Sequence, residues 1–254
     1  MLEYGVASHK GKVRKSNEDY YYIPQEGRTT AIAMVADGMG GHNAGEKASR
    51  MAVEAIIELA TEESDTIIKE PLKFIEESIK ASNNKIFSFS TNNEEYTGMG
   101  TTLVLALFHK DNVYIGHVGD SRGYLIRNGE AIQLTKDHSL VQELLDNGSI
   151  TLDEVEGHPQ KNIITRALGT DERVENDCYE LTLQADDIIV LCTDGLILHV
   201  DLQKEIKLFQ SIESMQELAS ILVEQALERG GLDNITVVAA KYSGMLKEAQ
   251  SLAR

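Results

Sequence analysis

Residues 31–41 read Ala-Ile-Ala-Met-Val-Ala-Asp-Gly-Met-Gly-Gly, an apolar run that ends in an aspartate and then in glycines. Six apolar residues before a turn signal predict a buried strand, and Asp37 is expected at the point where that strand leaves the core. The glycines would let the backbone bend sharply and approach a ligand closely, because they carry no Cβ. One Asp-Gly pair is common in turns and by itself says little about function.

The same arrangement recurs along the chain. Asp120 follows the apolar run 113–119, Asp194 follows the run 188–193, and Asp233 comes shortly before another strand-like run. Strands lying side by side would bring these carboxylates to one edge of the sheets, where they repel one another unless cations neutralise them. Carboxylate and carbonyl oxygens suit hard divalent metals such as magnesium or manganese. The pattern therefore indicates a multi-metal hydrolytic centre.

The overall composition, 42% hydrophobic and 26% charged over 254 residues, is that of an ordinary globular protein. A net charge of −17 argues against nucleic acid or an anionic membrane as the main partner. Two cysteines, Cys178 and Cys192, exclude a disulfide scaffold and favour structural thiols in a reducing compartment. The chain has no signal-peptide pattern and no apolar run near the ~20 residues of a membrane span, so we expect a cytoplasmic protein.

A basic loop interrupts this acidic chain between two predicted strands. It carries Lys10, Lys12, Arg14 and Lys15. One interpretation is a solvated turn. The other is phosphate recognition, since the planar fork of arginine matches pairs of phosphate oxygens. The acidic pair Glu18-Asp19 follows closely, which places negative and positive groups together.

Apolar residues at three- and four-residue spacing predict helices over 44–62, 71–89 and 215–229, with a further helix near 201–210. Residues 113–119 and 124–127 are predicted to form the two arms of a hairpin, followed by a tight turn at Asn128-Gly129. Strands paired by hairpins, with helices between them, suggest antiparallel sheets covered by helices.

Polar signals mark where several helices begin and end. Asp137 or Ser139 is the expected N-cap of a helix over 140–145, and Thr151 and Ser214 each open a capping-box pattern. Gly230-Gly231 predicts the end of the last helix. Residues 146–165 are polar and turn-rich, as expected of a mobile loop that gates substrate access on a rigid body.

Seven motifs, taken together and in this order, resemble the metal-dependent protein serine/threonine phosphatases of type 2C, in their compact bacterial form. The motifs are Arg14-x-x-Asn17-Glu18-Asp19, Asp37-Gly-Met-Gly-Gly-His42, Gly98-Met-Gly-Thr-Thr102, Gly119-Asp-Ser-Arg122, Asp137-His-Ser-Leu140, Asp194-Gly195 and Gly231-Leu-Asp-Asn-Ile-Thr236. The resemblance implies an α+β fold, a four-layer αββα sandwich of two antiparallel sheets flanked by helices on both faces. It also implies one catalytic domain over residues 1–242, with a flap at about 146–165 and a C-terminal tail at 243–254.

The resemblance further implies a role for each matching residue. Asp37 would bridge two Mn²⁺ or Mg²⁺ ions, with the Gly38 carbonyl on one of them and Asp194 and Asp233 completing the second site. Asp120 would hold a third, weaker metal. Glu18 and Asp19 would act through metal-bound waters, and Arg14 would hold the substrate phosphate.

The implied reaction is hydrolysis of phosphoserine and phosphothreonine on proteins, opposing a bacterial serine/threonine kinase. A hydroxide bridging two divalent metals would attack phosphorus in line, while Arg14 and the metals neutralise the phosphoryl oxygens. Where animal relatives have a histidine after the Asp-Gly pair, this chain has Met39, so His42 and a metal-bound water are alternative proton donors. Residues 197–199 (Ile-Leu-His) also depart from the family pattern, which bears on loop packing more than on catalysis.

The sequence also bears on three other classes of function. A catalytically dead binding module on the same fold would be expected to lose a core ligand, yet Asp37, Asp194 and Asp233 are all present. A cation-binding protein without activity does not account for Arg14 beside an acidic pair, and the chain lacks the calcium-loop pattern. A phosphoesterase for small molecules cannot be separated from a protein phosphatase by sequence. The oligomeric state is left open.

Overall fold

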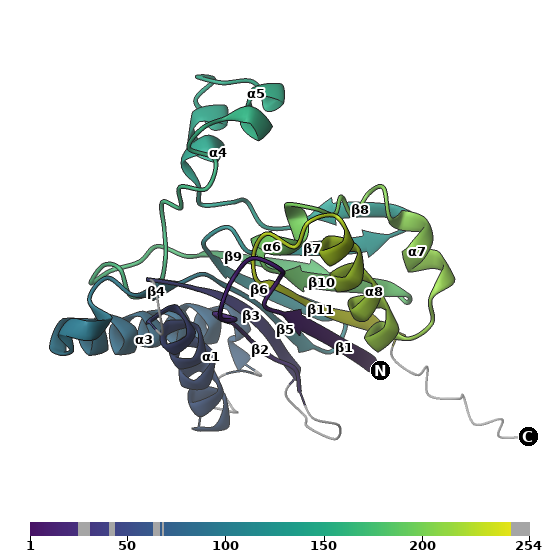
Figure 1. Cartoon of the computed structure of the whole chain (residues 1–254). Helices are drawn as coiled ribbons and strands as arrows, with labels where there is room; N and C mark the ends of the chain where they lie inside the picture. The colour runs from purple at the N-terminus through teal and green to yellow at the C-terminus, as the bar shows by residue number, and fades with distance from the viewer. Residues whose placement is uncertain (25–30, 41–43, 63–66, 68, 245–254) are drawn as a thin grey trace, which may run out of the picture.

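The structure, a computed structural model, describes residues 1–24, 31–40, 44–62, 67 and 69–244. Within this part of the chain, two antiparallel sheets lie face to face (Figure 1). Sheet A has the strand order β1 (Leu2–His9), β11 (Ile235–Tyr242), β10 (Asp187–Cys192), β7 (Arg122–Arg127) and β8 (Glu130–Gln133). Sheet B has the order β2 (Asp19–Tyr22), β3 (Ala31–Met39), β5 (Leu103–His109), β6 (Asn112–Val118) and β9 (Asp177–Thr182), with β4 (Gly100–Thr101) paired to β3.

Helices cover the outer face of each sheet. The helices α1 (Ala44–Glu62) and α3 (Pro71–Asn92) pack on sheet B, and the short η1 (Glu94–Tyr96) follows α3. On sheet A lie α6 (Asp194–Ile197), α7 (Ile206–Ser211) and α8 (Met215–Glu228). The α4 (Leu140–Asp146) and α5 (Leu152–Gly157) helices stand away from both sheets, at the top of Figure 1. The predicted α+β sandwich of four layers is therefore confirmed.

Three apolar layers hold the sandwich together. The layer between the sheets includes Val35, Ile115 and Leu191, whose side chains are all at most 1% exposed. The layer under α1 and α3 and the layer under α8 complete the core. The alternation of strand residues between inner and outer layers follows from the pleat, which points successive side chains to opposite faces.

The helix predictions agree with the structure at most positions. The helix predicted over 44–62 is α1, and the one predicted over 71–89 extends three residues further, to Asn92. Ser139 is the N-cap of α4, with its Oγ accepting from the Gln142 N–H at 3.4 Å. Thr151 and Ser214 both lie at helix starts, and Thr151 forms the full capping box with Glu154. The α8 helix ends at Glu228, with Arg229 as its C-cap, before the predicted glycines.

Three predictions about individual elements were wrong. The strand with Asp37 does not end there, because β3 continues to Met39 by pairing with β4. The helix near 201–210 is shorter: turns occupy residues 202–205, where Asp201 Oδ1 accepts from the Gln203 N–H at 3.1 Å, and α7 begins only at Ile206. The predicted hairpin of 113–119 with 124–127 does not form, since β6 belongs to sheet B and β7 to sheet A.

Two smaller features agree with the sequence. The turn at Asn128-Gly129 joins β7 to β8, with positive φ at both residues (53° and 82°), as a tight hairpin turn of this kind requires. Neither Cys178 nor Cys192 forms a disulfide. No helix that the structure describes has both the length and the apolar character needed to cross a bilayer.

Candidate metal centre

Strand directions bring the predicted aspartates to one end of the sandwich. Asp37 lies near the end of β3 and Asp120 just after β6, and both strands run antiparallel to β5 between them, so their ends meet at the same edge of sheet B. Asp194 follows β10 and Asp233 precedes β11, which pair antiparallel in sheet A. The carboxylates of the two sheets therefore face one another across the open end.

Asp37 is held by its backbone, which leaves its carboxylate free for other contacts. It lies opposite Asp19 in the β2–β3 register. Its N–H donates to Thr102 Oγ1 at 3.0 Å, and its carbonyl accepts from the Thr102 N–H at 2.9 Å and from Thr101 Oγ1 at 2.8 Å. These bonds fix the position of the side chain without using its oxygens.

The glycine after Asp37 is required by close packing. A Cβ on Gly38 would lie 2.0 Å from the carbonyl oxygen of Gly45, the second residue of α1. The Gly38 N–H donates to the Glu18 carbonyl at 3.2 Å, which ties β3 to the acidic pair. Only glycine allows the backbone to pass this close to the start of α1.

Asp19 connects the two sheets. Its Oδ2 accepts from Thr193 Oγ1 at 2.9 Å and from Thr236 Oγ1 at 2.7 Å. Both threonines belong to the sheet A side of the interface between the sheets. The neighbouring Glu18 N–H donates to Asn234 Oδ1 at 2.7 Å. The sequence interpretation gave Thr193, Asn234 and Thr236 no role, although all three stand within or beside quoted motifs.

Arg14 extends over the same edge. Its Nη2 forms an ion pair with Asp233 Oδ2 at 2.7 Å, and the arginine side chain is 56% exposed. The basic loop is held against the Asp233 segment by a bond from the Lys12 N–H to the Gly231 carbonyl at 2.7 Å. The Asn234 amide also donates to the Lys10 carbonyl at 2.9 Å.

The departure at residues 197–199 has a structural role. His199 Nε2 accepts from the Leu232 N–H at 3.2 Å, and the His199 carbonyl accepts from Arg229 Nη1 at 3.2 Å. This histidine therefore supports the loop that carries Asp233. His42, the predicted proton donor, lies outside the described residues.

Burial and mutual repulsion act on the carboxylates. Burial, and then the charges of Asp19, Asp194 and the other aspartates, raise the pKa of Asp37 well above its ordinary value. Burial is also the main reason that the pKa of Asp194 is raised to about 6 and that of Asp120 to about 7. The pKa of Asp19 rises to about 7 in spite of its two threonine partners. When ionised, these buried carboxylates repel one another, and a bound cation would remove this unfavourable electrostatic energy.

The donor set fits divalent cations. Asp19 Oδ1, Asp120 Oδ1 and Asp194 Oδ1 are buried and have no hydrogen-bond partner. Buried carboxylate oxygens normally find partners, and unpaired ones fit hard cations, which prefer oxygen ligands. Among the described residues, no three His, Cys, Asp or Glu side chains lie close enough together to hold a metal ion as they are. Since the carboxylates repel one another, a cation would have to draw them together.

A cavity lies beside these groups, between the body of the protein and the segment with α4 and α5. In the body, Arg122 binds Asp137 through Nε (2.9 and 3.1 Å) and Nη2 (2.7 Å), and Asp137 therefore holds the turn that follows Asp120. The lining residues include Asp120, Arg122, Asp137 and Asp194 from the body, and Glu156 and Lys161 from the protruding segment. The open end thus has a polar recess next to the carboxylates.

Comparison with known proteins points to one family for nearly the whole chain. The sequence matches the protein phosphatase 2C family over residues 8–229. It is 39% identical over 239 residues to the serine/threonine phosphatase stp of Listeria welshimeri, with 94% of this chain and 95% of that protein covered. It is also 39% identical over 239 residues to the protein phosphatase PhpP of Streptococcus pneumoniae, with 93% and 96% covered.

Solved structures give the same result. The crystal structure of the Mycobacterium tuberculosis serine/threonine phosphatase PstP/Ppp has a TM-score of 0.86 at 38% identity, with 95% of this chain and 99% of that one covered. The catalytic domain of PstP in complex with two manganese ions has a TM-score of 0.82 at 38% identity, with 94% and 97% covered. This chain belongs to the protein phosphatase 2C family.

Proposed function

We propose that this protein is a metal-dependent phosphatase that hydrolyses phosphoserine and phosphothreonine in proteins. The observation that carries the proposal is the convergence of Asp19, Asp37, Asp120, Asp194 and Asp233, three of which have a buried oxygen without a partner. Two relatives with 39% identity over nearly the full chain are a serine/threonine phosphatase and a protein phosphatase. The PstP structure with two manganese ions supports a centre of two divalent cations.

The residues that would hold the cations follow from the family motifs. Asp37 and the Gly38 carbonyl would hold the first, Asp37, Asp194 and Asp233 the second, and Asp120 a weaker third. Glu18 and Asp19 would act through water. When bound, two divalent cations lower the pKa of water towards about 7 and polarise phosphoryl oxygens.

Arg14 would bind the phosphoryl oxygens of the substrate. Its guanidinium is exposed and already oriented by Asp233 at 2.7 Å, so it can offer its remaining N–H groups to an incoming phosphate. Asp233 and the neighbouring carboxylates raise the pKa of Arg14, which keeps it charged. It would thus position the phosphate and neutralise charge in the transition state. His42 remains the candidate donor of a proton to the leaving alkoxide.

The wider assignment rests on the same argument. We assign residues 1–242 to one catalytic domain, with 146–165 as a flap over the recess and 243–254 as a tail. A serine/threonine kinase would be the functional counterpart. The free thiols of Cys178 and Cys192 are consistent with a reducing compartment such as the cytoplasm.

The test measures phosphate release from a phosphothreonine peptide, with manganese and with excess chelator, for the wild type and Asp194→Asn. We expect turnover that requires manganese and falls by at least about 100-fold in the variant, the scale of a lost group that stabilises the transition state. Asp186→Asn is the matched control, since Asp186 lies in the turn before β10, at the end of that strand opposite Asp194.

Two other outcomes separate the alternatives. Turnover of p-nitrophenyl phosphate without turnover of phosphopeptides would favour a phosphoesterase for small molecules. No turnover of either substrate with any divalent metal, while metal still binds, would overturn the proposal and favour a phosphoprotein-binding module.

A further inference from the structure

His138 lies against the loop that carries Asp120. The ring Nδ1 of His138 accepts from the Gly119 N–H at 3.0 Å, and the backbone N–H of His138 donates to the Gly119 carbonyl at 2.8 Å. Gly119 has a φ of +107°, and a Cβ there would lie 2.6 Å from the Thr102 side chain. A single residue therefore holds both backbone groups of the glycine that directs the chain into Asp120.

The same residue anchors the segment with α4 and α5. The His138 carbonyl accepts from the Thr165 N–H at 2.8 Å, where that segment returns to the body. One residue further on, the Leu140 N–H donates to the Ile163 carbonyl at 2.9 Å, and Ser139 forms a bridge with Ile164. The two ends of the protruding segment are thus joined at His138, next to the Asp120 loop.

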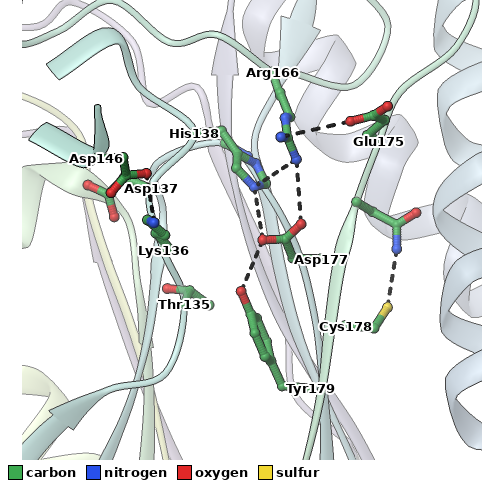
Figure 2. Close-up of polar contacts among 12 residues, drawn as sticks. Thr135, Lys136, Asp137, His138, Asp146, Arg166, Glu175, Asp177, Cys178 and Tyr179 are labelled. Carbon is green, nitrogen blue, oxygen red and sulfur yellow. Dashed lines mark hydrogen bonds and ion pairs between the residues drawn. The ribbon is translucent and has the colours of Figure 1, made fainter. Parts of the chain in front are cut away.

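The outer nitrogen of the imidazole has its own partners (Figure 2). Nε2 lies 3.4 Å from Asp177 Oδ2 and 3.3 Å from Arg166 Nη1. Because Nδ1 accepts from Gly119, the ring proton is assigned to Nε2, which then donates to Asp177 and not to Arg166. Asp177 also accepts from the Tyr179 hydroxyl at 3.0 Å, and its other oxygen faces Arg166 Nη1 at 3.4 Å. Arg166 directly follows the Thr165 contact.

A second histidine packs on the ring of His138. The ring centroids of His117 and His138 lie 4.6 Å apart, with planes at 34°. His117 is fully buried, and burial lowers its pKa to about 3. Burial, and then Arg166, also lower the pKa of His138. Both rings are therefore neutral at pH 7, as the acceptor role of Nδ1 requires.

We propose that His138 is a positioning residue that couples the flap to the Asp120 loop, an inference that rests on the proposed phosphatase function. The imidazole, fixed between Asp177 and His117, sets the backbone at Gly119, and its carbonyl sets the return of the flap at Thr165. A substrate protein that contacts the flap would then depend on the bonds of His138 to both the flap and the Asp120 loop. A small substrate does not contact the flap and would depend on these bonds less.

Two amide substitutions separate the contacts of the ring. In His138→Asn the amide oxygen can take the place of Nδ1 and accept from Gly119, whereas in His138→Gln the amide reaches only to the place of Nε2, near Asp177. NMR on the whole protein measures the hydrogen-exchange rate of the Gly119 amide. This rate reports the bond from the Gly119 N–H to His138 Nδ1 and does not depend on enzyme activity. We expect exchange to rise roughly 10-fold in the Gln variant and to change by less than about 2-fold in the Asn variant, as one hydrogen bond implies.

Kinetics provide the second measurement. We expect KM for a phosphothreonine protein substrate to rise roughly 3–10-fold in His138→Gln, the effect of one lost hydrogen bond, with kcat for p-nitrophenyl phosphate within about 2-fold. His138→Asn should restore the KM. His109→Asn, at the far end of β5, is the matched control.

Equal behaviour of the Asn and Gln variants, or unchanged Gly119 exchange in the Gln variant, would overturn the proposal. Equal losses on both substrates would do the same, since they indicate a general structural role. If the Gln variant does not fold, Asp177→Asn makes the same test from the other side of the ring, with faster Gly119 exchange expected and unchanged exchange contradicting it. If the wild type hydrolyses no phosphopeptide, the proposed function fails while the exchange measurement still decides on His138.

Discussion

At the residue scale, the two Asp-Gly pairs have a common physical reason. A Cβ on Gly38 would lie 2.0 Å from the Gly45 carbonyl oxygen, and a Cβ on Gly195 would lie 1.9 Å from the Asn234 carbonyl oxygen. In each pair the glycine lets one backbone pass against another directly beside the aspartate. The repeated dipeptide is therefore a packing requirement that places a carboxylate at a crossing of two chain segments.

This reason leads to a prediction about stability. Gly38→Ala should lower the free energy of unfolding by at least about 3 kcal/mol, since the new methyl meets backbone that cannot rotate away. Gly123→Ala is the control, because a Cβ on that buried glycine would meet only side-chain atoms at 3.5 Å. Urea unfolding of the two variants measures the difference. Similar stabilities would show that α1 can shift to accommodate the methyl group.

The raised carboxylate pKa values give a second prediction, for the metal-free protein. The pKa of Asp120 is raised to about 7, so the folded state binds more protons than the unfolded state between about pH 4 and 7, and stability falls as the pH rises through that window. Asp120→Asn removes this penalty. Its stability relative to the wild type should therefore grow by about 2 kcal/mol between pH 5 and 8.

Thermal unfolding in excess chelator at several pH values measures this difference. The comparison with the variant is needed because the buried His117 and His138, whose pKa values are lowered, have the opposite effect and destabilise the fold as the pH falls below about 6.5. Both proteins share that effect, so the difference between them reports the charge of Asp120 together with its repulsion of Asp194 and Asp37. A difference that does not change with pH would contradict the raised pKa.

Site residues were predicted unevenly from the sequence, for physical reasons. Aspartates at strand ends are a local signal, and the order of motifs adds to it. The threonine partners of Asp19 could not be predicted in the same way, because the contacts of Thr193 and Thr236 depend on how two sheets register against each other. Such contacts join residues 174 and 217 positions apart in the chain.

At the element scale, periodicity predicted the helices well and strand partners less well. The α8 helix shows an apolar stripe and polar caps that need no tertiary information. In contrast, β6 and β7 follow each other closely, as hairpin arms do, but the chain crosses between the sheets at residues 119–121. A strand that changes sheet has the same local pattern as one that turns back, so the sequence alone could not tell them apart.

The cap of α8 is a test at this scale. Ser214 Oγ accepts from the Glu217 N–H at 3.4 Å, and Ser214→Ala should cost about 1 kcal/mol, or about 2–4 °C in Tm for a chain of this size. Ser220→Ala, inside the same helix, is the control and should cost less, because alanine has the higher helix propensity. Phosphatase activity should not change in either variant, since α8 covers the outer face of sheet A. Equal Tm values would show that the cap adds nothing.

At the scale of the whole molecule, the candidate centre belongs to neither sheet alone. Asp37 and Asp120 come from sheet B, Asp194 and Asp233 from sheet A, and Asp19 binds across the interface. The apolar layer between the sheets therefore sets the distance between the two groups of ligands. The sequence predicts that these residues converge, but the spacing between them comes from the packing of the entire sandwich.

Charge is also distributed over the whole molecule. The chain carries a net charge of −17, yet Lys10, Lys12 and Lys15 lie exposed in the loop that is held against Asp233. We predict that changing all three to Glu lowers kcat/KM for an acidic phosphopeptide by roughly 10-fold at low ionic strength, since like charges slow the approach of the substrate. The effect should shrink at about 0.5 M salt, where the Debye length is only a few ångströms.

A control of equal charge makes this prediction specific. Lys80, Lys110 and Lys207 are exposed on α3, the β5–β6 turn and α7, so their triple change to Glu alters the net charge by the same amount away from the basic loop. If the loop provides a local field, only the first triple variant should lose activity, and p-nitrophenyl phosphate should be affected less than the acidic peptide. Equal losses in the two variants would assign the effect to net charge, because a uniform charge acts on any approaching anion regardless of where it is placed.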